Sequence, residues 1–278
     1  MNKHLLAASI AAALLAAACS TTTAPAQKTA ACGTETDILT PTPLLHSARA
    51  GDAANVRCLL EAGADIRATD DYGKTALMHA AETGRTDAVR LLLEKGADPN
   101  AADTKFATTA LMFAAYEGHT DAMRALLDAG ADIHAGNKVG FTALMGTALH
   151  MHADAARLLL DRGADLQATD GHGDTALIVA ANRPQPHVAR LLLERGANVN
   201  AANHAGKTAL MKAAAESKTD IVRALLDKGA NPNATDKDGH TALSLAQNAL
   251  RDAQKGGYTT LANDAQTIVG MLRAAGAK

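Results

Sequence analysis

The sequence predicts an all-α solenoid of about seven helix-turn-helix units with short hairpin fingers, because two markers recur along it at the same step. A threonine that precedes an apolar run returns every 33 or 34 residues, at Thr42, Thr75, Thr109, Thr142, Thr175, Thr208 and Thr241. A glycine that follows a second apolar run keeps this step, at Gly63, Gly96, Gly130, Gly163, Gly196 and Gly229. One period in two independent markers indicates stacked copies of a single unit, each burying its apolar faces against its neighbours.

The first helix of a unit is best seen in residues 70–101. Thr75 is expected to cap it, because a threonine hydroxyl can accept a hydrogen bond from a free backbone N–H of the first turn. Apolar residues follow at helical spacing, at Leu77, Ala80 and Ala81. The two alanines keep this helix thin, so neighbouring units can stack closely.

The second helix of the same unit is expected to begin at Thr86-Asp87, which offer a capping hydroxyl and a negative charge suited to a helix N-terminus. Gly96 is expected to end this helix, because glycine readily adopts the left-handed conformation at that position. Residues 70–73 have the composition of a turn, which predicts a hairpin finger between units.

The Gly-Ala-Asp and Gly-Ala-Asn triplets and the Thr-Ala-Leu-Met runs resemble the ankyrin repeat over residues 40–278. The resemblance implies an array that binds partner proteins through its concave side. The family prefers Thr-Pro-Leu-His, but here only the first unit keeps the proline, and the histidine position holds Leu45, Met78, Met112, Met145, Ile178, Met211 and Ser244. We therefore expect methionine packing in place of the family's Thr–His hydrogen bond.

Three units depart from the pattern. Unit three has Ala107 where the finger glycine would stand, and unit five has Pro184-Gln185-Pro186 in place of its loop glycine. In unit seven the final glycine, Gly276, follows Gly229 by 47 residues. This surplus predicts a lengthened first helix, a break at Gly256-Gly257 and a closing helix from about Asp264 to Ala275.

The N-terminal residues predict export from a bacterial cell. Residues 1–18 combine Lys3 with an apolar run that is shorter than the roughly 20 residues of a membrane span, which is typical of a signal peptide. Cys19 follows small residues and resembles a lipoprotein processing site, and Ser20 after it implies sorting to the outer membrane. The alternative is ordinary cleavage after Ala18, which gives an unlipidated periplasmic protein. Residues 19–39 are rich in Thr, Ala and Pro and predict a flexible tether.

The other two cysteines, Cys32 and Cys58, suggest a disulfide, because an exported chain meets an oxidising compartment. Such a bond would pin the tether to the second helix of unit one. The alternative is a pair of free thiols, with Cys58 at a position where other units carry leucine.

Composition argues against several classes of function. The net charge is −2, with no basic field of the kind that nucleic acids attract. We find no phosphate-binding loop or hydrolase motif, so we predict no cofactor and no catalytic residue. His150, His152 and Asp154 lie close in sequence, but a structural zinc site normally takes four ligands, so a metal-dependent enzyme is the least favoured hypothesis and we assign no metal site.

The expected partner-binding residues lie at finger tips and on the exposed face of the first helices in units two to four. They are Asp71, Tyr72, Lys74, Lys105, Phe106, Tyr116, Glu117, Lys138 and Phe141. Four of these are aromatic in a chain with three Tyr, three Phe and no Trp. Since aromatic anchors dominate interface energetics, we interpret them as a binding patch. The alternative is that the rings only brace the array. Phe113 is assigned to the packed side of its helix.

Together these observations predict a monomer that binds a protein partner in the envelope, touches the membrane only through a lipid anchor and does not bind nucleic acid. It would protect or scaffold a periplasmic protein. The alternative is an inhibitor or immunity protein that blocks an envelope-active toxin.

Overall fold

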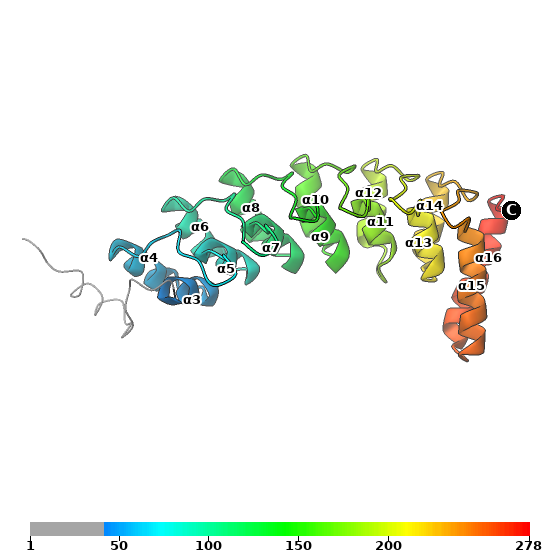
Figure 1. Cartoon of the computed structure of the whole chain (residues 1–278), viewed down its shortest axis with the longest axis horizontal. Helices are drawn as coiled ribbons and strands as arrows, with labels where there is room; N and C mark the ends of the chain where they lie inside the picture. Colours follow the sequence, from blue (N-terminus) through cyan, green and yellow to red (C-terminus); the bar gives the residue numbers. More distant parts are fainter. Residues whose placement is uncertain (1–41) are drawn as a thin grey trace, which may run out of the picture.

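The computed structural model describes residues 42–278, which form an arch of paired helices (Figure 1). One helix of each pair lies along the concave side of the arch. These inner helices are α3 (Thr42–Ala50), α5 (Ala76–Glu82), α7 (Ala110–Glu117), α9 (Ala143–His150), α11 (Ala176–Ala181), α13 (Ala209–Ala215) and α15 (Ala242–Lys255). The outer helices are α4 (Ala53–Glu61), α6 (Thr86–Glu94), α8 (Thr120–Asp128), α10 (Ala153–Asp161), α12 (His187–Glu194), α14 (Thr219–Asp227) and α16 (Thr259–Ala274). The predicted all-α solenoid is confirmed.

The recurring threonines cap the inner helices as the sequence predicts. The Thr75 hydroxyl accepts a hydrogen bond from the Met78 backbone N–H at 3.3 Å. The same bond to the residue three positions later is made by Thr109, Thr142, Thr175, Thr208 and Thr241. Behind the caps, Leu77, Ala80 and Ala81 and their counterparts are buried between successive units. The small alanines let the inner helices approach one another.

The outer helices begin differently from the prediction. Arg85, and not Thr86, is the residue before α6, and no side chain caps this helix. The expected threonine cap is therefore wrong. The Thr86 backbone N–H instead donates to the Gly84 carbonyl oxygen at 2.9 Å, so the tight loop already provides the acceptor that a capping side chain would offer. Asp87 does lie in the first turn, where its negative charge favours the helix N-terminus.

Unit seven ends in a longer helix pair whose free end projects beyond the other units on the concave side (Figure 1). The lengthened α15 and the break after it are confirmed, with Gly257 in a left-handed conformation at φ 72°. The closing helix α16 begins at Thr259 and not near Asp264 as predicted. Its buried residues extend back only to Ala265, so the first turns are held by pairing with α15 rather than by an apolar core.

The fingers are short antiparallel turns closed by isolated bridges, such as Thr69 with Thr75. Each successive finger also donates a backbone N–H to a carbonyl of the finger before it. Lys138 N–H bonds to Phe106 O at 2.8 Å, and Gly171 N–H bonds to Val139 O at 2.7 Å. We call this series of backbone bonds the finger ladder. Ala107 adopts the left-handed conformation of the missing finger glycine, with φ 57°.

Several predictions fall on residues 1–41, outside the part of the chain that the structure describes. These are the signal peptide at 1–18, the tether at 19–39, the lipidation site Cys19 and the cysteine Cys32. Cys58 is disulfide-bonded, while its pairing with Cys32 stays a prediction. None of the helices within residues 42–278 is long and apolar enough to span a membrane.

Candidate functional site

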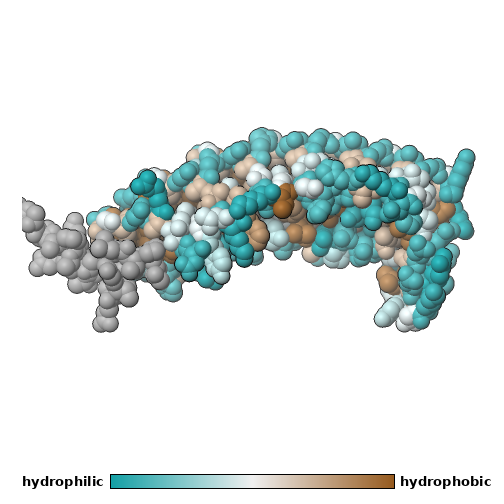
Figure 2. Space-filling view, viewed as in Figure 1, coloured by the Kyte–Doolittle hydropathy of each residue, from teal (hydrophilic) through white to brown (hydrophobic). Residues whose placement is uncertain are grey.

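A hollow of about 330 Å³ lies on the concave side, where α7 meets the fingers of units three and four. We call it the groove. It is lined by Glu82, Phe106, Thr108, Met112, Phe113, Tyr116, Glu117, Asn137, Phe141 and Thr142. Hydrophobic surface is visible over the middle of the array and at the free end of α15 and α16 (Figure 2). The groove therefore combines an aromatic lining with a few polar groups, which is the usual make-up of a binding site.

Four of the predicted binding residues line the groove, namely Phe106, Tyr116, Glu117 and Phe141. Two others lie at its edge. The Lys105 ammonium lies 5.1 Å from the ring centroid of Phe106 and 5.2 Å from that of Tyr72. Phe106 is 53% exposed and Tyr72 is 57% exposed, so these rings do not simply fill space between units.

Tyr116 reaches the groove because the next inner helix carries a glycine. A side chain on Gly146 would bring its Cβ within 3.3 Å of the Tyr116 ring. The ring of His150 lies 4.1 Å from that of Tyr116, and His152 donates from Nε2 to the Tyr116 carbonyl oxygen at 3.1 Å. The two histidines therefore hold Tyr116 in place.

The surroundings of His150 also determine its protonation. Burial, together with the charges of His152 and Arg183, lowers the pKa of His150, while Glu117 acts in the opposite direction. His150 is therefore neutral at pH 7 and suited to packing against an aromatic ring. His150, His152 and Asp154 do not converge as metal ligands.

Phe113 packs against the core, as its assignment to the packed side of the helix predicts, but it is only half-buried and also lines the groove. The Lys74 ammonium lies 4.2 Å from the centroid of this ring and 2.8 Å from Glu82 Oε1. Lys74 thus makes a cation–π contact and an ion pair with two residues of the groove lining. Sequence reasoning also missed Met112 and Asn137 as lining residues.

Two predicted residues lie elsewhere. The Lys138 ammonium donates to the carbonyl oxygens of Thr104 at 2.7 Å and Lys105 at 3.0 Å, so it braces two fingers against each other. Asp71 borders a separate hollow beside Leu45 and His46 at the start of the array. The structure therefore separates these two side chains from the groove.

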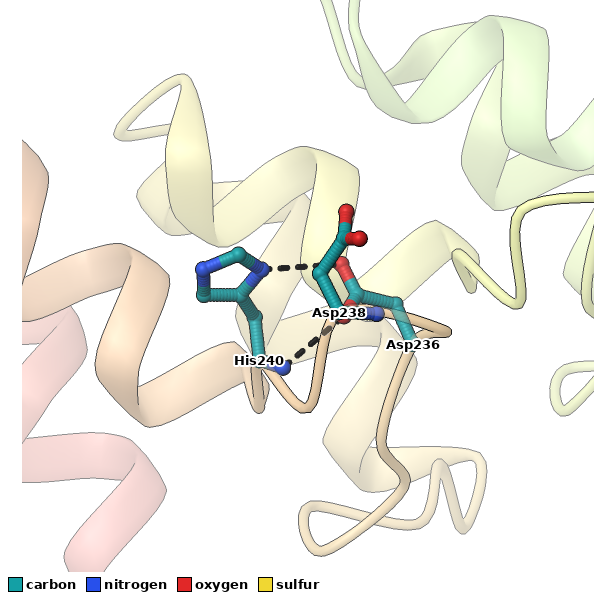
Figure 3. Close-up of side chains that lie close together, drawn as sticks. All are labelled: Asp236, Asp238 and His240. Carbon is teal, nitrogen blue, oxygen red and sulfur yellow. Dashed lines mark hydrogen bonds and ion pairs between the residues drawn. The ribbon is translucent and has the colours of Figure 1, made fainter.

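Outside the groove, Asp236, Asp238 and His240 form the one group of three potential metal ligands among residues 42–278 (Figure 3). Oδ1 of Asp236 accepts the backbone N–H groups of Asp238 at 3.0 Å and His240 at 2.8 Å, and Oδ2 lies 3.3 Å from His240 Nδ1. The same turn is made by Asp70, Asn137, Asp170 and Asn203 in other fingers. We therefore interpret the group as a finger turn rather than a metal site.

Asp236 gives a prediction about stability. The D236A substitution should lower the free energy of unfolding by about 1–3 kcal/mol, because two backbone N–H groups lose a buried acceptor. The D236N substitution should lower the free energy of unfolding by less, since asparagine makes this turn in two other fingers. Urea unfolding at pH 7 measures both values. Equal losses would contradict the turn interpretation.

The Asp236 carboxylate also makes the stability of the fold depend on pH. Burial alone would raise the pKa of Asp236, but the hydrogen bonds from His240 and from the Asp238 backbone outweigh it and lower the pKa. A lowered folded-state pKa means that the ionised form stabilises the fold above about pH 4, and that this contribution is lost as the pH falls through the folded-state pKa. The stability difference between wild type and D236N should therefore shrink in acid.

Comparison with known proteins gives a consistent result. The family model described as ankyrin repeats (3 copies) matches residues 14–103, 102–170, 152–236 and 177–255. The crystal structure of the human ASB11 ankyrin repeat domain is similar, with a TM-score of 0.68, 25% identity, and coverage of 73% of this chain and 91% of that chain. The ankyrin repeat domain of Bcl-3, a member of the IkappaB protein family, is similar with a TM-score of 0.65 and 32% identity, covering 73% of this chain and 93% of that chain.

A comparison with curated proteins gave no match. The family model nevertheless spans most of the array, and both solved domains align along nearly their whole length. Ankyrin repeat domains are generally protein-interaction modules without catalytic activity. The chain belongs to the ankyrin repeat family.

Proposed function

We propose that this protein binds a segment of a partner protein in the groove formed by units two to four. The observation that carries the proposal is the distribution of aromatic residues. All three Phe of the chain and one of its three Tyr line this single hollow. Aromatic side chains are enriched at the energetic centres of protein interfaces. A concave surface on a rigid repeat array is also already shaped for binding, which limits the entropy lost on association.

The cellular setting is part of the proposal. The signal-like residues 1–18 and the lipoprotein-like Cys19 support export to the periplasm and anchoring in the outer membrane. There the protein would protect or scaffold a resident protein. Incorporation of labelled palmitate in a Gram-negative host tests the anchor, because it should be abolished by the C19S substitution. Palmitate labelling that survives in C19S would contradict anchoring at this residue.

Site-directed photocrosslinking tests the binding surface. A benzoylphenylalanine at position 116 should crosslink to a discrete envelope protein in living cells. The Phe106→Ala and Phe141→Ala double variant, with the same probe, should reduce the yield at least about tenfold, as expected for the loss of two interface anchors. The crosslinked band would be identified by mass spectrometry.

The free end of α15 and α16 offers a matched control. Tyr258 is 66% exposed and Leu261 is 42% exposed, so they resemble the groove aromatics in exposure but lie at the other end of the array. The Tyr258→Ala and Leu261→Ala double variant should leave the crosslink at position 116 unchanged. A crosslink lost in this control and kept in the groove variant would move the binding surface to unit seven.

A further inference from the structure

The charged side chains that line the groove all carry the same, negative charge. Among residues 42–278, the lining contains two carboxylates, Glu82 and Glu117, and four aromatic rings, but no Lys, Arg or His. The face of an aromatic ring carries negative electrostatic potential and attracts a cation placed within about 6 Å of its centroid. Rings and carboxylates therefore favour the same kind of ligand. A purely apolar segment would instead desolvate the carboxylates without compensation.

The chain itself shows that these groups accept a cation. The Lys74 ammonium lies 4.2 Å above Phe113 and pairs with Glu82 at 2.8 Å. This internal contact neutralises Glu82 and occupies Phe113. Lys105 approaches Phe106 in a similar way from the edge, at 5.1 Å. Two lysine ammonium groups of the chain therefore already make the kind of contact with the lining that we expect from a cationic group of a ligand.

Glu117 and Phe141 are left without such a contact. Glu117 is exposed at the end of α7 and forms no ion pair with any residue of the range 42–278. Its nearby histidine, His150, packs on Tyr116 and does not carry a compensating charge at pH 7. Within the described part of the chain, the half-buried Phe141 ring has neither a cation nor a second ring against it. The Glu117 carboxylate and the face of the Phe141 ring are therefore available to a ligand.

We propose that the groove recognises an arginine side chain in an extended segment of the partner protein, with the guanidinium against Tyr116 and Phe141 and paired with Glu117. This inference rests on the proposed function and specifies its ligand. Arginine fits better than lysine because its planar, weakly hydrated guanidinium can stack on a ring while it bonds a carboxylate. The hollow of about 330 Å³ also leaves room for an apolar neighbour of the arginine.

The three Phe residues provide a direct readout. Since all of them line the groove, the full chain labelled only on its Phe rings gives NMR signals that report on this site alone. The probe is an acetylated and amidated peptide with arginine between two leucines. Its twin carries citrulline, which has the same shape without the charge. We expect the arginine peptide to shift the Phe signals and the citrulline peptide to bind about tenfold more weakly.

Two variants test whether Glu117 is the carboxylate that recognises the charge of the arginine. The E117Q variant should bind the arginine peptide about fivefold more weakly and the citrulline peptide as before, because only a charged ligand gains from the carboxylate. The matched control is E216Q. Glu216 stands three repeats later at the same repeat position, but Ala215 replaces the aromatic neighbour there. This control should bind both peptides like wild type. Circular dichroism confirms that the variants fold.

Three results would overturn the proposal. Equal binding of the arginine and citrulline peptides would show that charge is not recognised, and it would leave protein binding through the groove intact. A shift of the Phe signals by tetramethylammonium chloride as strong as that by the peptide would assign the groove to a small cation. An absence of any shift with the arginine peptide would exclude this ligand, whereas only failure of the photocrosslink counts against the proposed function itself.

Discussion

The L159A variant is expected to lower the free energy of unfolding by about 2–5 kcal/mol, the range for emptying a fully buried leucine site. Leu159 lies in α10, in the middle of the array, and is 0% exposed. The cavity would open where α10 packs between the neighbouring outer helices α8 and α12, so the central unit would lose packing against the units on both sides. Urea unfolding followed by circular dichroism measures the loss.

The first unit provides the control for this variant. Leu59 occupies the same position of the outer helix α4 and is also 0% exposed. In a linear array a weakened end unit can detach while the rest stays folded, but a weakened central unit cannot be bypassed. We therefore expect L59A to reduce hydrogen-exchange protection mainly in α3 and α4, with a smaller effect on global unfolding. Equal global losses in L59A and L159A would contradict this account.

The I268D variant should detach the closing helix from the array. Ile268 in α16 is 0% exposed, and an unpaired carboxylate in such a site costs several kcal/mol, or must be protonated. Because α16 packs on α15 and α14, its loss would expose the last inner surface of the solenoid. Hydrogen exchange should show loss of protection in α15 and α16, while α5 to α9 stay protected.

Thr267 gives the matched control, since it is exposed on the neighbouring position of α16. The T267D variant adds the same charge to the same turn without burying it. It should leave protection in α15 and α16 within experimental error. If T267D and I268D behave alike, the effect comes from charge on the helix and not from the loss of the buried contact.

Much of the fold could be predicted because each unit repeats its own local signals. The threonine caps and the position of Ala107 follow from the chemistry of a few neighbouring residues. The start of α16 and the missing cap at Thr86 were not predictable in this way. The first depends on pairing with α15, and the second on a carbonyl that the loop itself provides.

The groove was predictable in part, and Phe113 shows the limit. Helical spacing placed this ring on the packed side, but the same repeat position holds His79, Gly146, Val179 and Lys212 in other units. Such a mixture is not typical of a core position and could have signalled partial exposure. What sequence alone could not give is the space for Tyr116, which depends on Gly146 of the next helix. The separation of Lys138 and Asp71 from the groove likewise required the fold.

The finger ladder has a consequence for how such a protein can change over time. Its bonds join backbone atoms, as from Lys138 N–H to Phe106 O, so they do not depend on which side chain stands at the tip. Tip residues can therefore be exchanged with little effect on the stability of the array. Selection, or a designer, could retarget this surface to new partners by substituting finger tips such as Tyr72 and Phe106 while the scaffold remains the same.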